Sequence, residues 1–440
     1  MNREDRFDVF LSYAFKDRGV AHALANLLSS AGLRVWFFDW SAVPGESVVE
    51  SIQKGLSKAG CILVLVGHDF GPSQTAEVTW ARHARNAPKI VPILLPDSSI
   101  PSDLRETQAV DMRRVDREHD QISKLLEAVG RAVGGPALPR SDERDDDNLV
   151  ARFSFEVSKG DVYRELGADS KSVSCYTAAL EVGVRVRRRE GDEADLDMIA
   201  PVASRLGALQ AKMGRLADAR NTYQVLVKAL KDGLGVEHPM TLEAMSSSAA
   251  IAAALGDLTT ARSLQEEVLA IRGRNDGPNG PATLRALGEL AQTLFASGEL
   301  VGARSLYDQA LRTVLEMRGP GDPGTRSVLN NLAAVLVAQG ELPEARRLLE
   351  ENLRVFMQEF GRDNVDTLRA ANNLADTLRM SGDLDGARAL QEQVLEGRRR
   401  ILGPDHPDTL GTANNLADTL RMSGDLDGAR ALRRSKPWIE

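Results

Sequence analysis

Apolar and polar residues follow two different patterns along this chain, and the change between them falls after about residue 135. The first part contains short apolar runs, such as Phe7–Leu11 and Cys61–Gly67, each followed by a segment with apolar residues at helical spacing. Such alternation predicts parallel strands joined by crossover helices. The later part lacks these runs and keeps helical spacing, which predicts an all-helical region.

Five strands and four helices can be assigned in the first part. We expect strands at Phe7–Leu11, Leu33–Phe38, Cys61–Gly67, Lys89–Leu95 and Gln108–Asp111, and helices at Lys16–Ser30, Val48–Lys58, Ser73–Arg85 and Gln121–Val133. Some of these strands are nearly all apolar, as central strands covered on both faces are. The pattern predicts a three-layer α/β domain at 1–135, with a flavodoxin-like five-stranded parallel sheet in the order 2-1-3-4-5.

A sheet of this order binds ligands at the carboxyl ends of strands 1 and 3, where the winding reverses. Those ends are Ser12–Asp17 and Gly67–Glu77, and the loop Asp39–Ser47 would hang over the same crevice. The acid that we expect in this crevice is Glu77, in the first turn of its helix. Spacing alone leaves two interpretations open: a functional carboxylate, or a charge that complements the helix dipole.

Three segments of this domain resemble the signature segments of the Toll/interleukin-1 receptor (TIR) domain, and its bacterial members most closely. They are FDVFLSYAFKD from Phe7, VWFFDWSAVPGESVVESIQKGL from Val35, and CILVLVGHDFGPSQTAEVTWA from Cys61. Enzymatic members of the family cleave NAD+ at the nicotinamide–ribose bond, using a glutamate that falls on Glu77 here. In the family a tryptophan four residues earlier helps to form the nucleotide site, whereas this chain has Ser73 there.

The resemblance therefore implies NAD+ as substrate, no cofactor, and Glu77 as the catalytic residue. Ordinary glycosidases use two carboxylates, but nicotinamide leaves as a neutral base from a cationic pyridinium and needs no proton. One carboxylate near the ribose can stabilise the developing oxocarbenium charge and hold the ribose hydroxyls. Residues that could form the substrate-binding wall, each with a structural alternative, are Ser12, Tyr13, Asp39, Trp40, Gly45 and Ser73.

Composition argues against several other classes of protein. The net charge of -8 and the isoelectric point near 5.5 argue against nucleic acid as the main ligand, because binding its backbone needs clustered positive charge. Two distant cysteines and six scattered histidines show no ligand spacing, so we expect no metal. The charged N-terminus and the short longest apolar run, Cys61–Val66, predict a cytoplasmic protein with no membrane partner.

The helical part is organised by a repeat. The twenty residues Ala371–Leu390 return unchanged at Ala413–Leu432, 42 residues later. Glycine recurs at every such step from Gly214 to Gly424, each followed at a fixed distance by an alanine–arginine pair, and a second glycine series keeps the same period. A fixed period of this length predicts a solenoid.

The residue pattern of each repeat predicts two helices. In the fifth copy we expect Asp366-Thr367 to cap the first helix, Gly382 to make the turn, and the second helix to run from Leu384 to about Arg399. The pattern resembles tetratricopeptide repeats, in the longer version found in kinesin light chains. The resemblance implies a superhelix whose concave face binds proteins or peptides. Asparagine is unfavourable inside a helix, so the equivalent first-helix asparagines are either peptide-binding candidates or structural hydrogen-bond partners: Asn331, Asn373 and Asn415.

The sequence between the two parts predicts a linker at 136–149 and a degenerate helical repeat at 150–199, ahead of an array of six repeats at 200–440. The last repeat is incomplete, because the chain gives RRSKPWIE after Leu432. Solenoid ends need capping. We therefore expect the C-terminal turn to pack against another subunit, and the protein to self-associate through its TIR-like domain and its repeats.

The two resemblances together imply an NAD+ glycohydrolase that is activated when the array assembles or binds a partner, in bacterial immunity against phage. The alternative is a non-enzymatic adaptor whose TIR-like domain pairs with its own kind while the array recruits a protein client. A further option is a transferase that makes cyclic or base-exchanged nucleotides at the same site.

Overall fold

The computed structural model describes residues 6–41, 45, 47–84, 87–116, 121–133, 149–190 and 196–434. The chain divides into two compact units, Met1–Ala244 and Met245–Glu440. Of the linker predicted at 136–149, only Leu149 lies within the described residues. The C-terminal turn that we expect to contact another subunit, 435–440, lies outside them as well.

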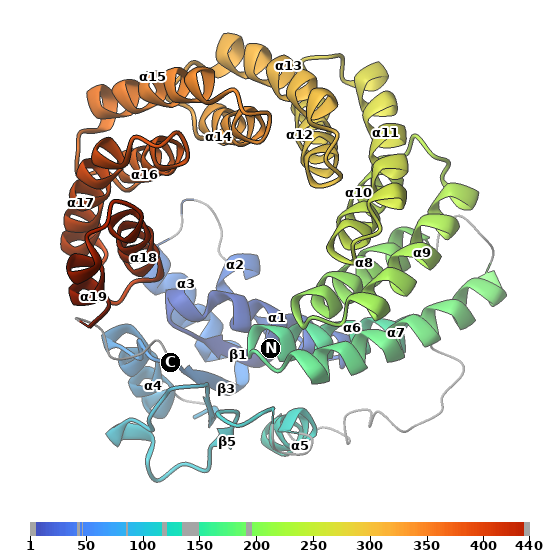
Figure 1. The fold of residues 1–440 in the computed structure, drawn as a ribbon. Coiled ribbons are helices and arrows are strands. Elements are labelled where there is room, and N and C mark those ends of the chain that lie inside the picture. The colour runs from blue at the N-terminus through green and yellow to red at the C-terminus, as the bar shows by residue number, and fades with distance from the viewer. Residues whose placement is uncertain are drawn as a thin grey trace. The chain divides into compact units, whose positions relative to one another are not determined.

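A parallel sheet forms the centre of the α/β domain in the first unit (Figure 1). Its order is β2-β1-β3-β4-β5, which confirms the sequence prediction. The strands are β1 Phe7–Ser12, β2 Val35–Trp36, β3 Ala59–Val66, β4 Lys89–Leu94 and β5 Val110–Asp111. The helices packed on it are α1 Arg18–Ser30, α3 Val48–Lys58, α4 Pro72–His83 and α5 Gln121–Val133.

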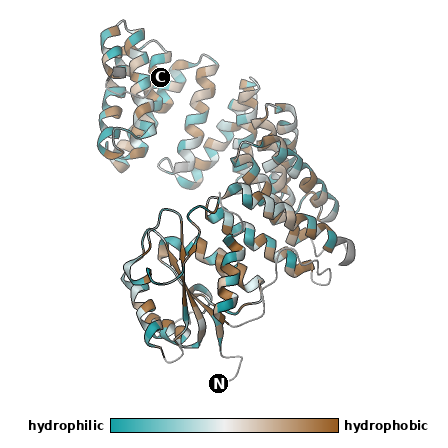
Figure 2. Ribbon diagram, turned by 90° about the horizontal axis from the view of Figure 1, so that it is seen from below, coloured by the Kyte–Doolittle hydropathy of each residue, from teal (hydrophilic) through white to brown (hydrophobic). Residues whose placement is uncertain are grey.

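The central strand β3 is buried on both faces. Leu63 and Leu65 lie in a cluster with α1 and α5, whereas Ile62 and Val64 lie in a second cluster with α3 and α4. A strand covered on both faces needs apolar side chains at every position, not at alternate ones. This is why the sequence showed one continuous apolar run here, and Figure 2 shows brown, hydrophobic colour gathered along the strands.

Two local predictions about this domain were wrong. The segment predicted as a loop, Asp39–Ser47, begins inside a short helix, α2 Phe38–Ser41. Helix α4 begins at Pro72 and has no acid in its first turn, so Glu77 lies in the second turn. The favourable effect of the helix dipole falls off within the first turn. Complementing the dipole therefore does not account for this glutamate.

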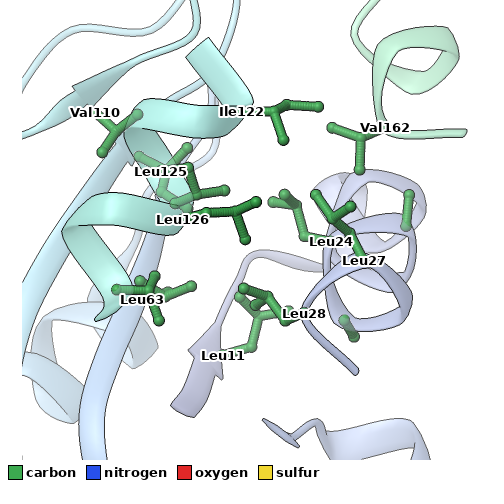
Figure 3. Close-up of a cluster of buried hydrophobic side chains, with 14 of the residues drawn as sticks. Leu11, Leu24, Leu27, Leu28, Leu63, Val110, Ile122, Leu125, Leu126 and Val162 are labelled. Carbon is green, nitrogen blue, oxygen red and sulfur yellow. The ribbon is translucent and has the colours of Figure 1, made fainter. Parts of the chain in front are cut away.

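The first helical pair beyond the α/β domain, α6 Leu149–Glu165 and α7 Asp169–Glu190, packs on that domain through α6. Val162 of α6 is fully buried and belongs to the same cluster as Leu24 of α1 and Ile122 of α5, toward which it points in Figure 3. The ammonium of Lys171, on α7, also donates a hydrogen bond to the Val115 carbonyl. The core on this side of the sheet thus extends into the helical region.

The opposite side of the α6–α7 pair faces the repeats. Tyr176 of α7 is fully buried in a separate cluster, which includes Leu206 of α8. It packs against Gly160 of α6, where a β-carbon would overlap its ring. Tyr223 packs in the same way against Gly207. The remaining helices of the first unit are α8 Leu196–Lys212 and α9 Leu216–Gly233.

The second unit is an arc of paired helices. First helices of successive repeats, which lie on the inner side in Figure 1, contact one another: α12 with α14, α14 with α16, and α16 with α18. The helices from the unit boundary onward are α10 Pro239–Ala254, α11 Leu258–Asn275, α12 Pro281–Ala296, α13 Leu300–Arg318, α14 Pro323–Ala338, α15 Leu342–Phe360, α16 Val365–Met380, α17 Leu384–Ile401, α18 Pro407–Met422 and α19 Leu426–Arg434.

The periodic residues each have a structural role. Gly382 has φ +84°, a left-handed conformation that costs other residues roughly 1–2 kcal/mol, and its equivalents share it. Ala387 is fully buried where paired helices cross. Arg388 donates to Asp425 of the next repeat at 3.4 Å, as Arg262 does to Glu299 at 2.6 Å. One exposed ion pair contributes little, but the same contact recurs between several successive repeats.

The cap predicted at Asp366-Thr367 was wrong by two residues. Asn364 caps α16, and its side-chain oxygen accepts a hydrogen bond from the Asp366 amide at 2.8 Å. His406 caps α18 in the same way through Nδ1, at 3.2 Å from the Asp408 amide nitrogen. Both residues stand immediately before the helix, where a side-chain acceptor satisfies a free first-turn amide.

Candidate functional site

The carboxyl ends of β1 and β3 and the start of α4 meet at one edge of the sheet. Ser12, the last residue of β1, lies beside Val64 in the β1–β3 register. Glu77 extends from the second turn of α4 and interacts with the Ser12 hydroxyl. Both side chains are buried, with exposed fractions of 1% and 9%. The edge where the winding of the sheet reverses therefore carries a buried carboxyl group.

The environment of Glu77 is poorly suited to a charge. Burial raises the pKa of its carboxyl above the usual 4.5, and the Ser12 hydroxyl opposes that shift. Neither Glu77 Oε2 nor Ser12 Oγ has a hydrogen-bond partner of normal geometry among the described residues. A buried polar atom without a partner costs about 1–3 kcal/mol. Such unsatisfied groups need a reason, and substrate binding or catalysis is one.

Gln74 is a member of this cluster that the sequence analysis missed. It lies one helical turn before Glu77, on the same face of α4, and is 2% exposed. Its Nε2 donates to the Leu65 carbonyl at 2.8 Å, which ties α4 to the end of β3. Its Oε1 is buried, and no described residue bonds to it. A polar residue one turn before a candidate acid, inside a buried helix face, was the available signal.

Tyr13 and Asp39 form a second layer beside the buried carboxyl. Burial and the Asp39 carboxylate raise the pKa of the Tyr13 hydroxyl to about 12, and the charge of Glu77 adds to the shift. The positive charge of Arg18 opposes this shift. Arg18 Nε also donates a hydrogen bond to Asp39 Oδ2 at 2.7 Å. The loop after β1, the helix after β2 and the start of α1 are thus joined at this edge.

The six predicted wall residues do not all gather at the carboxyl group. Ser12 and Tyr13 interact with Glu77, and Asp39 interacts with Tyr13. Trp40 is 45% exposed on α2 and packs edge-on against Phe37, with ring centroids 5.2 Å apart. Gly45 has φ +95° and open space where a β-carbon would lie. Ser73 is an exposed residue of the first turn of α4.

The candidate asparagines lie at equivalent positions of α14, α16 and α18, and they differ in their contacts. Asn331 is exposed and interacts with the hydroxyl of the buried Tyr307. Asn373 is partly exposed. Asn415 donates to Asp376 Oδ1 at 3.1 Å, from α18 to α16. The structural alternative, a hydrogen bond between helices, is therefore present at Asn331 and at Asn415.

Asp376 itself is a partly buried acid of the inner helix α16. Burial raises the pKa of its carboxyl, while the charge of Arg379 and hydrogen bonding to Asn372 oppose the shift. Asn372 donates from Nδ2 at 3.1 Å, but its Oδ1 is buried without a partner among the described residues. The amide network of the last repeats therefore leaves an acceptor unused.

Comparison with known proteins agrees with both parts of this description. Residues 9–126 match the family model of the TIR domain, and residues 241–316, 324–400 and 372–433 match that of the tetratricopeptide repeat. This chain is a TIR domain joined to tetratricopeptide repeats. The TIR domain contains β1 to β5 and the Glu77 edge, and the repeats contain the asparagine series.

A curated protein from Paracoccus denitrificans (strain Pd 1222), the NAD(+) hydrolase PdTIR, is 37% identical over 92 residues. The match covers 20% of this chain and 30% of that protein, so the chain spans under a third of its relative's length. The chain is similar in fold to the apo form of RapI, with TM-score 0.51, 13% identity and coverage of 72% of this chain and 79% of that one.

Another solved structure with this likeness is that of nearly identical TPR-like repeats from a putative kinesin light chain of Podosopora anserina. Its TM-score is 0.44 at 24% identity, and the match covers 46% of this chain and 94% of that chain. A crystal structure of BtubC (BKLC) from P. vanneervenii has the same TM-score at 19% identity, covering 55% of this chain and 94% of that one.

Other features of the TIR–repeat chain do not bear on Glu77. A cavity of about 650 Å³ lies between β4, β5 and α5, with Lys89, Lys124 and Arg131 in its lining. In the part of the chain that the structure describes, no group of three or more His, Cys, Asp or Glu side chains is placed to hold a metal. No helix there is long and apolar enough to cross a membrane.

Proposed function

We propose that the TIR domain hydrolyses NAD+ at the bond between nicotinamide and ribose, with Glu77 as the catalytic residue. The observation that carries the proposal is the buried carboxyl group at the reversal point of the sheet, one oxygen of which has no hydrogen-bond partner among the described residues. The NAD(+) hydrolase PdTIR, similar to 92 residues of this chain, supports the same reaction.

The reaction needs one carboxylate and one water. The C–N bond between ribose and nicotinamide breaks with its electron pair going to the ring nitrogen, which turns a pyridinium into neutral nicotinamide. The ionised carboxylate of Glu77 stabilises the positive charge that develops on the ribose. Water then forms the new C–O bond and loses a proton, giving ADP-ribose. A carboxyl group whose pKa is raised is a better acceptor for that proton than an ordinary one.

The test is NAD+ consumption by purified protein beside Glu77→Gln. Glutamine keeps the shape of the side chain and removes the charge, so we expect the rate to fall by about 100-fold or more, in the range of lost electrostatic stabilisation. Glu106→Gln is the matched control, because Glu106 is an exposed glutamate of the same domain. Equal loss in both variants, or consumption retained in Glu77→Gln, would count against a catalytic Glu77.

We also propose that assembly or partner binding through the repeats activates the domain, in the defence of a bacterial cell against phage. The inner helices α12, α14, α16 and α18 form a continuous row on which an extended peptide or protein segment could bind. The rate per molecule should then rise with protein concentration or on adding the partner. A constant rate per molecule across the monomer-to-oligomer range would oppose activation by self-association.

A second candidate is a non-enzymatic adaptor, which one observation favours. The TIR family usually has a tryptophan four residues before the glutamate, whereas Ser73 stands at that position and is exposed. An adaptor would show no NAD+ consumption in any assembled form. Chromatography of the products separates hydrolysis, which gives ADP-ribose, from formation of a cyclic or base-exchanged nucleotide at the same site.

Both candidate functions, hydrolase and adaptor, include a peptide ligand bound by the inner helices of the repeats. Asn373 remains the proposed contact to a ligand backbone, because Asn331 interacts with the Tyr307 hydroxyl and Asn415 bonds to Asp376. Asn373→Ala should weaken partner binding, while Asn414→Ala, at an exposed neighbouring position of the next repeat, should not. Equal affinity of the two variants would remove Asn373 from the proposed contacts.

A further inference from the structure

Asp17 occupies the N-cap position of α1 but does not cap the helix. Aspartate is among the best N-cap residues, because its carboxylate accepts a hydrogen bond from a first-turn amide. Asp257 and Asp383 do this at α11 and α17, accepting from Thr260 at 3.1 Å and from Gly386 at 3.0 Å. The Asp17 side chain makes no such bond. Its carboxyl group is therefore not used for the purpose that its position suggests.

The basic side chains next to Asp17 form ion pairs with other acids. Lys16 pairs with Asp69 at 2.6 Å, and Arg18 pairs with Asp39 at 2.7 Å. Asp17 Oδ2 is a buried atom, and no described residue gives it a hydrogen bond. The carboxyl group lies beside another acid, Asp69. Burial and the Asp69 charge raise the pKa of Asp17, and the Lys16 charge opposes this shift.

The backbone opposite Asp17 is shaped to receive this carboxyl group. Its two oxygens lie against Gly67, the first residue after β3, where any β-carbon would overlap them. Asp17 therefore spans from the loop after β1 to the loop after β3. These are the two strand ends between which an α/β sheet of this order binds its ligand. The same edge carries Ser12, which is 1% exposed and interacts with Glu77.

We propose that Asp17 is a substrate-binding residue that accepts hydrogen bonds from ribose hydroxyls of NAD+. An acidic side chain near the strand ends is the group that holds ribose hydroxyls in other dinucleotide sites of α/β sheets. A ribose diol offers donors without charge, which suits a carboxylate whose nearby cations are already paired. This inference rests on the proposed NAD+ hydrolase function and adds a second carboxyl group to a site for which the sequence suggested one.

The test separates a binding role from a structural one. In full-length Glu77→Gln protein, which leaves NAD+ intact, NAD+ affinity is measured by calorimetry with and without Asp17→Asn and Asp17→Ser. Serine can cap α1, so a purely structural Asp17 would tolerate it. We expect the dissociation constant to rise about tenfold or more, as when a hydrogen bond to a charged group is lost. The unfolding temperature should stay equal or rise.

The ligand provides the second arm of the experiment. NAD+ analogues that lack the ribose hydroxyl bound by Asp17 should bind more weakly to protein that keeps Asp17. Replacing Asp17 as well should weaken the binding of these analogues little further, because both changes break the same interaction. Asp103→Asn, at an exposed acid of the same domain, is the control and should leave affinity unchanged.

Three results would count against the inference. If both Asp17 variants bind NAD+ with an affinity within twofold of the protein that keeps Asp17, Asp17 is not a contact to NAD+. The hydrolase proposal would then still stand. If the Asp17 substitution and the loss of a ribose hydroxyl weaken binding independently for every deoxy analogue, Asp17 does not bind a ribose hydroxyl. If neither the wild-type nor the Glu77→Gln protein binds or consumes NAD+, the hydrolase proposal falls and this inference falls with it.

Discussion

The contact between α6 and the TIR domain gives a prediction that three valines can test. Val162, on α6, is fully buried in the cluster shared with α1 and α5. Val182, on α7, is 4% exposed and belongs to the cluster shared with the repeats. Val225, on α9, is 71% exposed. Mutating each to alanine removes the same two methyl groups from three different environments in one compact unit.

The expected magnitudes follow from burial. Two buried methyl groups correspond to roughly 1.6 kcal/mol at about 0.8 kcal/mol each, and the cavity left behind adds to this. Val162→Ala and Val182→Ala should therefore each lower the free energy of unfolding by about 2–3 kcal/mol. For a unit of this size that corresponds to roughly 4–12 °C in unfolding temperature. Val225→Ala should change the free energy by less than about 0.5 kcal/mol.

Calorimetry gives the stability loss, and hydrogen exchange followed by mass spectrometry locates it. If α6 is part of the TIR core, amide exchange in α1 and α5 should be faster in Val162→Ala than in Val182→Ala. The loss in Val182→Ala should fall on α6, α7 and α8, whose residues form its cluster. Identical exchange in α1 for the two variants would refute this description of the core. So would a Val162→Ala protein as stable as Val225→Ala.

Three further predictions concern the site and the array. Burial raises the pKa of Glu77 above 4.5, so the folded state binds this proton more tightly than the unfolded state and loses stability as pH rises through the folded-state pKa. Glu77→Gln should therefore raise the unfolding temperature at pH 7. In a calorimetric pH series, this gain over the wild-type protein should disappear below about pH 4.5. Gly382→Ala should destabilise the array by about 1–2 kcal/mol, because φ is positive there. Gly411→Ala, at a helical position with open space, should stabilise it by roughly 0.5–1 kcal/mol. Unfolding temperatures that shift in the same direction for both variants would contradict this prediction. Asn415→Ala should cost about 1–2 kcal/mol by removing the bond to Asp376, while Asn414→Ala should be near neutral in the same assay.

Local patterns were enough to predict most elements of the TIR domain. The run Cys61–Val66 within β3 is apolar at each position, and the structure shows why, since both faces of that strand are covered. The turn that carries Glu77 was predicted wrongly, although the predicted helix start, Ser73, is one residue from the observed start at Pro72. A helical turn holds 3.6 residues, and Glu77 is the sixth residue of α4, so it lies in the second turn.

By itself, the sequence determined the order of the sheet, the helical pairs, the period of the array and the identity of the candidate acid. These depend on short-range spacing, which the backbone geometry of strands and helices turns directly into structure. Only the tertiary structure decided that Glu77 Oε2 has no hydrogen-bond partner among the described residues, that Gln74 and Asp17 lie at the same edge, and that Asn415 is bonded to Asp376. Only it joined Val162 to the TIR core. Contacts of this kind bring together residues from separate elements, and their chemistry depends on burial and distance, which no local pattern encodes.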